Sequence, residues 1–215
     1  MEISDKTNRK TRHNLQKASD NDKMSVLLIE DHPSNNSPIT KALKYFNYRV
    51  INYLTASENI IDQIVLCNPN VLIVSTDQPN EKVLTELAEI NRLIPLPIII
   101  FAENDSPTVI QSAIKSGVSA YVVHEVLPQR IKSIISVANA RFKETQSLRD
   151  ELNKTKSQLE SRKLVERAKG LLMQQKQINE DEAYDTMRKM AMNQGNSLAI
   201  IAKNIVDVCE ILSTP

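Results

Sequence analysis

Five short runs with the character of buried strands, separated by amphipathic segments, constrain the fold of this 215-residue chain more than any other feature. The runs are 26–29, 49–53, 71–74, 97–101 and 120–123, and helical patterns cover 37–45, a segment that ends at Cys67, 81–93 and 106–116. Continuous apolar runs are typical of parallel strands that are covered on both faces. We therefore predict an α/β domain over residues 25–128, a doubly wound five-stranded parallel sheet whose ligand crevice lies at the carboxyl ends of its strands.

The composition argues against most catalytic and metal-binding sites. The chain has 3 glycines, too few for a glycine-rich phosphate loop, and its 3 histidines and 2 cysteines lack the spacing of metal ligands. No nucleophile is paired with a base. We expect no enzymatic activity, no cofactor and no metal site.

The distribution of apolar residues favours a cytoplasmic protein. No stretch approaches the ~20 apolar residues that a membrane-spanning helix needs. Residues 1–24 have mixed charge and lack the apolar segment of a secretory signal, and we predict that they form a disordered tail. The expectation is a cytoplasmic location without membrane contact.

A long helix is predicted after Pro128, because no proline and only one glycine, Gly170, occur from Gln129 to Met173. A heptad repeat places Ile131, Ala138, Thr145, Leu152 and Leu159 along one seam. The companion positions are Ile135 and Phe142, followed by the polar Arg149, Lys156 and Lys163. This pattern predicts a coiled-coil linker over residues 129–160 that forms a homodimer; the alternative is a single long solvated helix.

Three further helical patterns fill residues 161–215. Asn179, with Glu182 three residues later, is typical of a helix start, Gly195 of a helix end, and Ser197 of the next start. Each pattern has one apolar stripe, and three such helices can bury a small shared core. The sequence predicts a C-terminal three-helix bundle.

The N-terminal domain resembles a response-regulator receiver, a flavodoxin-like fold. Glu30 and Asp31, directly after the first strand, match the acidic pair with which receivers hold Mg²⁺. The aspartate, threonine or serine, and lysine that receivers use for phosphoryl transfer correspond here to Ser75, Ala102 and His124. A serine cannot accept a phosphoryl group as a carboxylate does, so the resemblance implies a pseudo-receiver with a degenerate phosphorylation site. Asp77 is a candidate substitute acceptor, although we expect it in a loop.

The C-terminal segment resembles an ANTAR domain, a family of antiterminators that bind paired RNA hairpins. The run Ala168–Met173 (AKGLLM), the spaced Glu182-Ala-Tyr184 and the later Arg188 with Ala191-Met192 carry the resemblance. The whole layout is similar to that of nitrate- and amidase-operon antiterminators. One departure is the loop Asn193–Asn196, where relatives often have basic residues. The RNA-binding residues that we expect are Lys163, Arg167, Lys169, Gly170, Tyr184 and Arg188, with the two lysines contacting phosphates and Arg188 reading bases beside Tyr184.

The leading hypothesis is therefore an RNA-binding transcription antitermination regulator that binds tandem hairpins in a leader RNA. The resemblance implies control by sequestration, with a ligand-sensing regulatory protein as a possible partner, and the degenerate site argues against control by phosphorylation. The alternative is a protein-interaction adaptor that has lost RNA binding. A phosphorylated DNA-binding regulator is a third class, which the missing acceptor aspartate disfavours.

Overall fold

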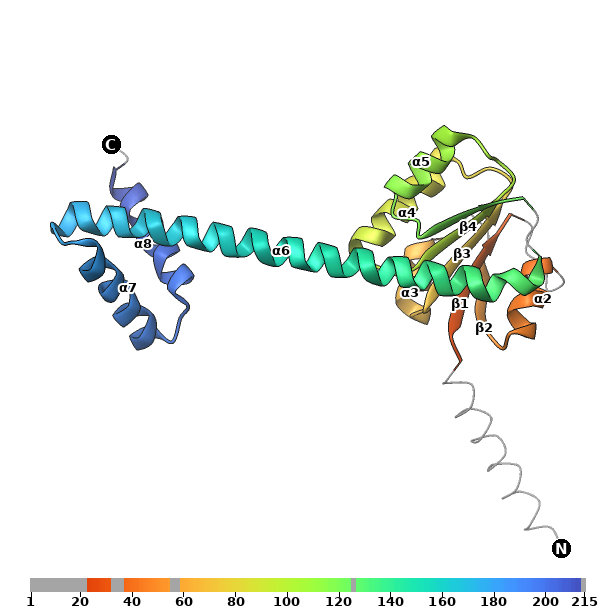
Figure 1. Ribbon diagram of the computed structural model, residues 1–215, viewed down its shortest axis with the longest axis horizontal. Helices are drawn as coiled ribbons and strands as arrows, with labels where there is room; N and C mark the ends of the chain where they lie inside the picture. The colour runs from red at the N-terminus through yellow and green to blue at the C-terminus, as the bar shows by residue number, and fades with distance from the viewer. Residues whose placement is uncertain (1–22, 32–36, 55–58, 125–126, 214–215) are drawn as a thin grey trace, which may run out of the picture. The chain divides into compact units, whose positions relative to one another are not determined.

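The computed structural model describes residues 23–31, 37–54, 59–124 and 127–213 (Figure 1). The chain divides into two compact units, unit 1 up to Thr145 and unit 2 from Gln146. The predicted disordered tail, residues 1–24, lies outside the described residues except for its last two. The domain boundaries expected at residues 128 and 160 remain predictions.

Unit 1 contains the predicted five-stranded parallel sheet. Its elements are β1 (Ser25–Glu30), α2 (Pro38–Tyr45), β2 (Arg49–Leu54), α3 (Ile60–Cys67), β3 (Val71–Thr76), α4 (Glu81–Leu93), β4 (Ile98–Ala102), α5 (Pro107–Lys115), β5 (Ala120–Val123), the 3₁₀ helix η1 (Pro128–Arg130) and the start of α6 (Ile131–Lys176). The strand order is β2-β1-β3-β4-β5, and all neighbouring strands are parallel. This order places a topological switch point between β1 and β3, where ligands bind in open α/β sheets.

Helices cover both faces of this sheet because successive strand residues point to opposite sides. On one face, Leu27, Leu72 and Ile98 pack with buried residues of α3, α4 and α5. On the other face, Leu28, Ile73 and their neighbours pack with α2 and α6. The doubly wound fold expected from the apolar runs is confirmed.

The first turns of α6 belong to the core of unit 1. Ile131, Ile135 and Ala138 are at most 1% exposed and pack against the sheet face that α2 also covers. The heptad pattern assigned these three positions to a coiled-coil seam, so that part of the prediction is wrong. A helix that packs on a sheet needs the same regular apolar stripe as a helix in a coiled coil. Here the sheet covers that stripe.

Unit 2 has a core of its own, built by the second half of α6, α7 (Glu180–Gln194) and α8 (Leu198–Ser213). Ala168, Met187 and Ala202, one from each helix, are fully buried there. The predicted helix signals act as expected: Asn179 and Glu182 form a capping box, Gly195 ends α7 with φ 63°, and the Ser197 hydroxyl accepts a hydrogen bond from the Ile200 N–H. The predicted three-helix bundle is confirmed.

Candidate functional site

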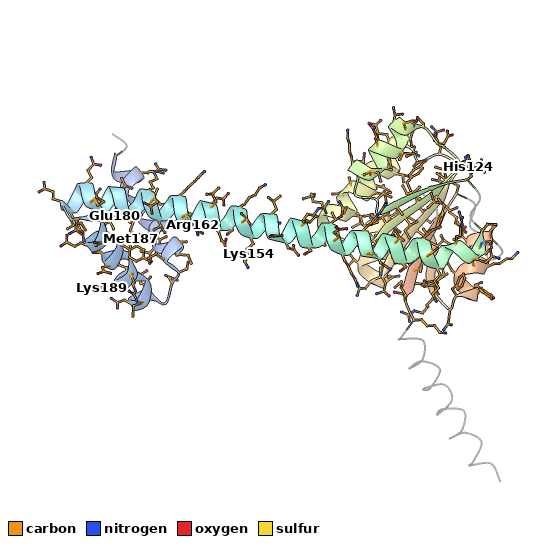
Figure 2. All side chains as sticks on the ribbon, in the orientation of Figure 1. His124, Lys154, Arg162, Glu180, Met187 and Lys189 are labelled. Carbon is orange, nitrogen blue, oxygen red and sulfur yellow. The ribbon has the colours of Figure 1, made fainter. Side chains whose placement is uncertain are left out.

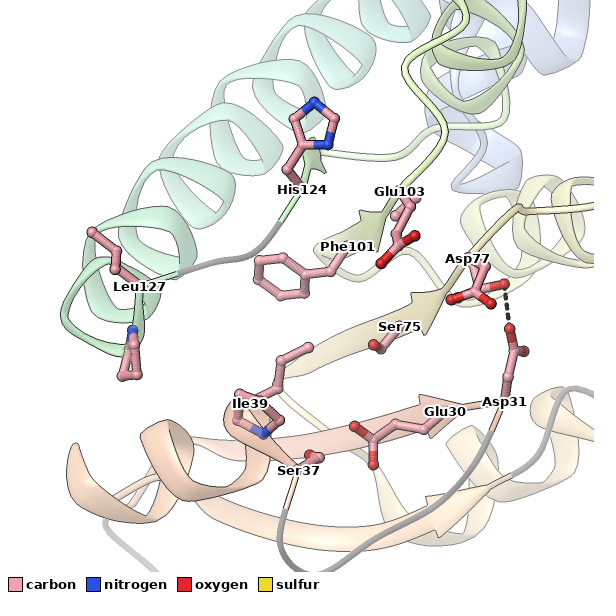
Figure 3. Close-up of a pocket in the computed structure, with 14 residues that line it drawn as sticks. Glu30, Asp31, Ser37, Ile39, Ser75, Asp77, Phe101, Glu103, His124 and Leu127 are labelled. Atoms are coloured by element: carbon pink, nitrogen blue, oxygen red, sulfur yellow. Dashed lines mark hydrogen bonds between the residues drawn. The ribbon is translucent and has the colours of Figure 1, made fainter.

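The five residues of the degenerate phosphorylation site meet at the carboxyl edge of the unit 1 sheet (Figure 3). Glu30 and Asp31 end or follow β1, Ser75 lies in β3, Ala102 ends β4 and His124 follows β5. All five line one pocket of about 460 Å³. The prediction follows from topology, because parallel strands bring their carboxyl ends to the same edge.

Backbone hydrogen bonds hold this edge together. The Asp31 N–H donates to the Ser75 carbonyl at 3.3 Å, and the His124 N–H donates to the Ala102 carbonyl at 3.0 Å. The Thr76 hydroxyl donates to the Asp31 carboxylate at 2.7 Å. His124 adopts a left-handed conformation with φ 67°, which is uncommon outside glycine and marks the turn that leaves β5.

Asp77, the candidate substitute acceptor, directly follows β3 and is exposed. Its backbone carbonyl accepts hydrogen bonds from the N–H groups of Glu103 and Asn104, both at 3.2 Å. These bonds tie the loop after β3 to the loop after β4. Ser75, at which we expect the degenerate acceptor position, lies within β3 itself.

In unit 2, four of the expected RNA-binding side chains lie on the surface, and one of them, Arg167, is ion-paired. Lys163 on α6 and Arg188 on α7 are exposed, and Tyr184, one helical turn before Arg188, is 43% exposed. The first turn of α7 is acidic, with Glu180, Asp181 and Glu182, whereas Arg188 lies in its second half. The charges of α7 therefore favour binding of a polyanion at its second half and oppose binding at its first turn.

Lys169 does not lie on that surface, contrary to our expectation. Its side chain is 10% exposed, and its ammonium contacts Glu166 at 2.8 Å and Glu180 at 2.5 Å. These hydrogen bonds raise the pKa of Lys169, and the bond from Lys169 lowers the pKa of Glu180. Lys169 thus connects α6 to the start of α7, and its ammonium is engaged by two carboxylates.

Arg167 is exposed, but it is ion-paired within the unit. Its guanidinium lies 2.6 Å from Glu210 on α8, and the two side chains are 60% and 55% exposed. Arg167 therefore reaches towards α8 while Lys169 reaches towards α7. These two cations, which we expected on one RNA surface, therefore pair with different helices.

Gly170 lies on the exposed surface of α6. A methyl group added there would meet no atom within 4 Å apart from its own helix backbone. Close packing against another helix therefore does not explain a glycine at this position in the described structure. Approach by RNA remains a prediction.

The sequence reasoning missed the carboxylates of the two other helices that pair with these cations, Glu180 on α7 and Glu210 on α8. A usable signal existed for Glu180, because it is the first residue of α7, directly after the short turn that follows the end of α6. None existed for Glu210, which lies 43 positions from Arg167 in the sequence. In the pocket, Phe101 and Glu103 were also missed as lining residues.

Among the described residues, no helix is long and apolar enough to cross a membrane. The same residues contain no group of three or more His, Cys, Asp or Glu side chains placed to hold a metal ion.

Comparison with known proteins gives matches for both units. Residues 153–206 match the ANTAR domain family. The transcriptional regulatory protein PdtaR of Mycobacterium tuberculosis is 25% identical over 190 residues, which cover 88% of this chain and 91% of that protein. The nitrate regulatory protein of Klebsiella oxytoca is 34% identical over 77 residues, 36% of this chain and 19% of that protein.

A solved structure matches the fold of the N-terminal part. The signal receiver domain of a modulated diguanylate cyclase from Desulfovibrio desulfuricans has a TM-score of 0.50 and 18% identity, and the match covers 58% of this chain and 99% of that domain. At this identity the match shows the receiver fold alone.

Proposed function

Because this chain carries a C-terminal ANTAR domain after a receiver-like domain, we propose that it is an RNA-binding transcription antitermination regulator. Its unit 2 binds tandem hairpins in a leader RNA and so prevents a terminator from forming. Two relatives named as regulatory proteins support the regulatory role. The observation that supports RNA binding is the exposure of two cations, Lys163 on α6 and Arg188 on α7, and of the aromatic Tyr184 one turn before Arg188.

The chemistry of this group suits a single-stranded loop within a hairpin. Lysine binds phosphate oxygens as a point charge, whereas arginine can pair with base edges and tyrosine can stack on an unpaired base. Tyr184 and Arg188 lie four residues apart on α7, so their side chains share one face of the helix. We assign phosphate contact to Lys163 and base reading to Arg188 with Tyr184.

Control by phosphorylation is not part of this proposal. The pocket presents Ser75 where receivers have the acceptor aspartate, and Ala102 there provides no hydroxyl to orient a phosphoryl group. We propose that a ligand-sensing partner protein sequesters the regulator instead.

A homodimer through α6 would present two copies of unit 2 to the two hairpins. Leu152 and Leu159 of the predicted seam are 52% and 53% exposed, and Leu148 is 61% exposed. Leu148 and Leu152 lie one helical turn apart, which places both on the face that a second helix could cover. Binding of the first hairpin would then raise the effective concentration of the second unit at the second hairpin.

The test measures binding of a labelled tandem-hairpin RNA by the full chain as a function of salt. Lys163→Ala should weaken binding to the cognate and a loop-scrambled RNA alike and reduce the salt slope by about one. Arg188→Ala should weaken cognate binding by about 1–3 kcal/mol and reduce the discrimination between the two RNAs. Lys115→Ala, on α5 of unit 1, is the matched control and should bind as the parent does.

If the variants of Lys163, Tyr184 and Arg188 all bind the cognate RNA like the parent chain, this surface does not bind RNA. Lys203 on α8 would then be the next residue to replace. No binding of the cognate RNA by the parent chain would favour the protein-interaction adaptor.

A further inference from the structure

We propose that Glu210 on α8 competes with RNA for Arg167 on α6. In the free protein the Glu210 carboxylate pairs with the Arg167 guanidinium. In the complex a phosphate of the RNA takes the place of that carboxylate. This proposal rests on the RNA-binding function proposed above and deepens it, since it adds Arg167 as a phosphate contact and names a charge within the protein that opposes RNA.

The ion pair of Arg167 is accessible to a ligand, whereas that of Lys169 is nearly buried. The Arg167 guanidinium lies 2.6 Å from the Glu210 carboxylate, and the two side chains are 60% and 55% exposed. The Lys169 side chain is only 10% exposed, and its ammonium contacts two carboxylates. Exposed ion pairs contribute little to stability, because water solvates both charges when they separate. An external anion can therefore replace Glu210 at Arg167 at little cost to the fold.

A phosphate group of RNA is well suited to make this exchange. A guanidinium has five N–H donors in a planar fork, which matches two oxygens of a phosphate as it matches those of a carboxylate. Glu210 competes as one fixed charge on α8. An RNA strand that is already bound nearby supplies several phosphates at a high effective concentration. The balance at Arg167 therefore shifts towards the phosphate once the RNA has made its first contact.

The position of Arg167 on α6 brings it next to the phosphate contact assigned to Lys163. Lys163, Arg167 and Gly170 are all exposed, and their spacing of four and three residues places them on one face of the helix. A methyl group added at Gly170 would meet no atom within 4 Å apart from its own helix backbone, so this face is open beside the guanidinium. The nearby Glu166 carboxylate contacts Lys169 at 2.8 Å, which offsets part of its repulsion of a phosphate.

An RNA strand bound at Lys163 therefore reaches Arg167 one helical turn further along α6. Arg167 adds to the affinity only after Glu210 has been displaced, so the parent chain binds RNA more weakly than a chain without that carboxylate. The competition acts on every RNA alike, because a phosphate contact carries no sequence information. The expected signature is thus a change in affinity without a change in discrimination between RNAs.

The experiment measures binding of a labelled tandem-hairpin RNA, and of the same RNA with scrambled loops, by the full chain and its variants at several salt concentrations. Arg167→Ala should weaken the binding of both RNAs alike and reduce the salt slope by about one, as loss of one phosphate contact does. Glu210→Gln should tighten the binding of both RNAs about fourfold, within the range that one exposed ion pair can contribute. Urea unfolding of each variant checks that unit 2 is folded.

The double variant Arg167→Ala/Glu210→Gln separates this ion pair from every other contact of Glu210. Without Arg167, the change Glu210→Gln should alter the affinity by less than about twofold, because the two effects are coupled. Two controls test for net charge. Asp207→Asn removes a carboxylate one turn earlier on α8, and Arg162→Ala removes another exposed arginine of α6, labelled in Figure 2, which its five-residue spacing from Arg167 places on a different face. Both controls should bind within about twofold of the parent chain.

The proposal is overturned if folded Arg167→Ala binds RNA like the parent chain, or if Glu210→Gln tightens the binding of neither RNA. Equal tightening by Asp207→Asn, or by Glu210→Gln in the absence of Arg167, would also overturn it, because net charge would then explain the effect. These results leave the proposed function standing when Lys163→Ala and Arg188→Ala behave as described above. Absence of RNA binding by the parent chain would refute both proposals.

Discussion

Replacing Ile135 with alanine should destabilise unit 1 strongly, whereas the same change at Leu152, on the same helix, should not. Ile135 is 1% exposed and packs against the sheet, while Leu152 is 52% exposed. Truncation of a buried isoleucine or leucine to alanine costs about 2–5 kcal/mol, and a surface substitution usually shifts stability by less than about 0.5 kcal/mol. With an m-value of about 2 kcal/mol per molar urea, a loss of about 3 kcal/mol lowers the urea midpoint by about 1.5 M.

The measurement is urea unfolding followed by pulsed hydrogen exchange of peptides from β3 and β4, which reports on unit 1 alone. A cost below about 1 kcal/mol for Ile135→Ala would show that the start of α6 is not part of the sheet core. A protein-concentration series adds a second result for Leu152→Ala. If its cost grows with protein concentration, Leu152 lies in an interface between copies.

Four further outcomes are expected. Replacing both Leu152 and Leu159 with aspartate should convert a dimer to a monomer in light scattering, because unpaired charges in a helix seam are costly, and a persistent dimer would place the interface elsewhere. Acetyl phosphate or beryllofluoride with Mg²⁺ should change neither the intact mass nor the RNA affinity, since Ser75 replaces the acceptor; a stable adduct would contradict the degenerate-site interpretation. Gly170→Ala should raise the unfolding free energy by about 0.5–1 kcal/mol, and a loss of RNA binding despite this gain would place RNA against the bare backbone. The ion pair between Lys169 and Glu180 should stabilise unit 2 fully between pH 4.5 and 10.5, the ordinary pKa values of a glutamate and a lysine. This stabilisation is lost as the pH falls through the lowered pKa of Glu180 or rises through the raised pKa of Lys169. Lys169→Met should therefore flatten the pH dependence of the unit 2 urea midpoint, and an unchanged profile would exclude the pair as its source.

Much of the fold could be predicted from local sequence patterns, because each pattern has a direct physical cause. Helix α4 extends over Glu81–Leu93, as the sequence predicts, because its apolar spacing is regular and the Asn80 side chain accepts a hydrogen bond from the Val83 N–H. The strands were found because apolar runs in a parallel sheet must be buried on both faces. The candidate pocket followed in turn, since parallel strands fix where their last residues meet.

The expected RNA surface was harder to predict, because charge alone does not say which partner a cation has. Lys169 and Arg167 are both basic residues beside the apolar stripe of α6. In the folded unit, one is nearly buried between two glutamates and the other pairs with Glu210 from a distant helix. Only the packing of three helices decides which cations remain on the surface.

The apolar stripe at the start of α6 separates what the sequence determines from what the tertiary structure decides. The spacing of Ile131, Ile135 and Ala138 requires that one face of this helix be covered. It does not specify what covers that face, because the hydrophobic effect is non-directional and either a second helix or a sheet face can bury the stripe. The sheet of unit 1 covers these residues, and Leu152 and Leu159, further along the same helix, remain exposed.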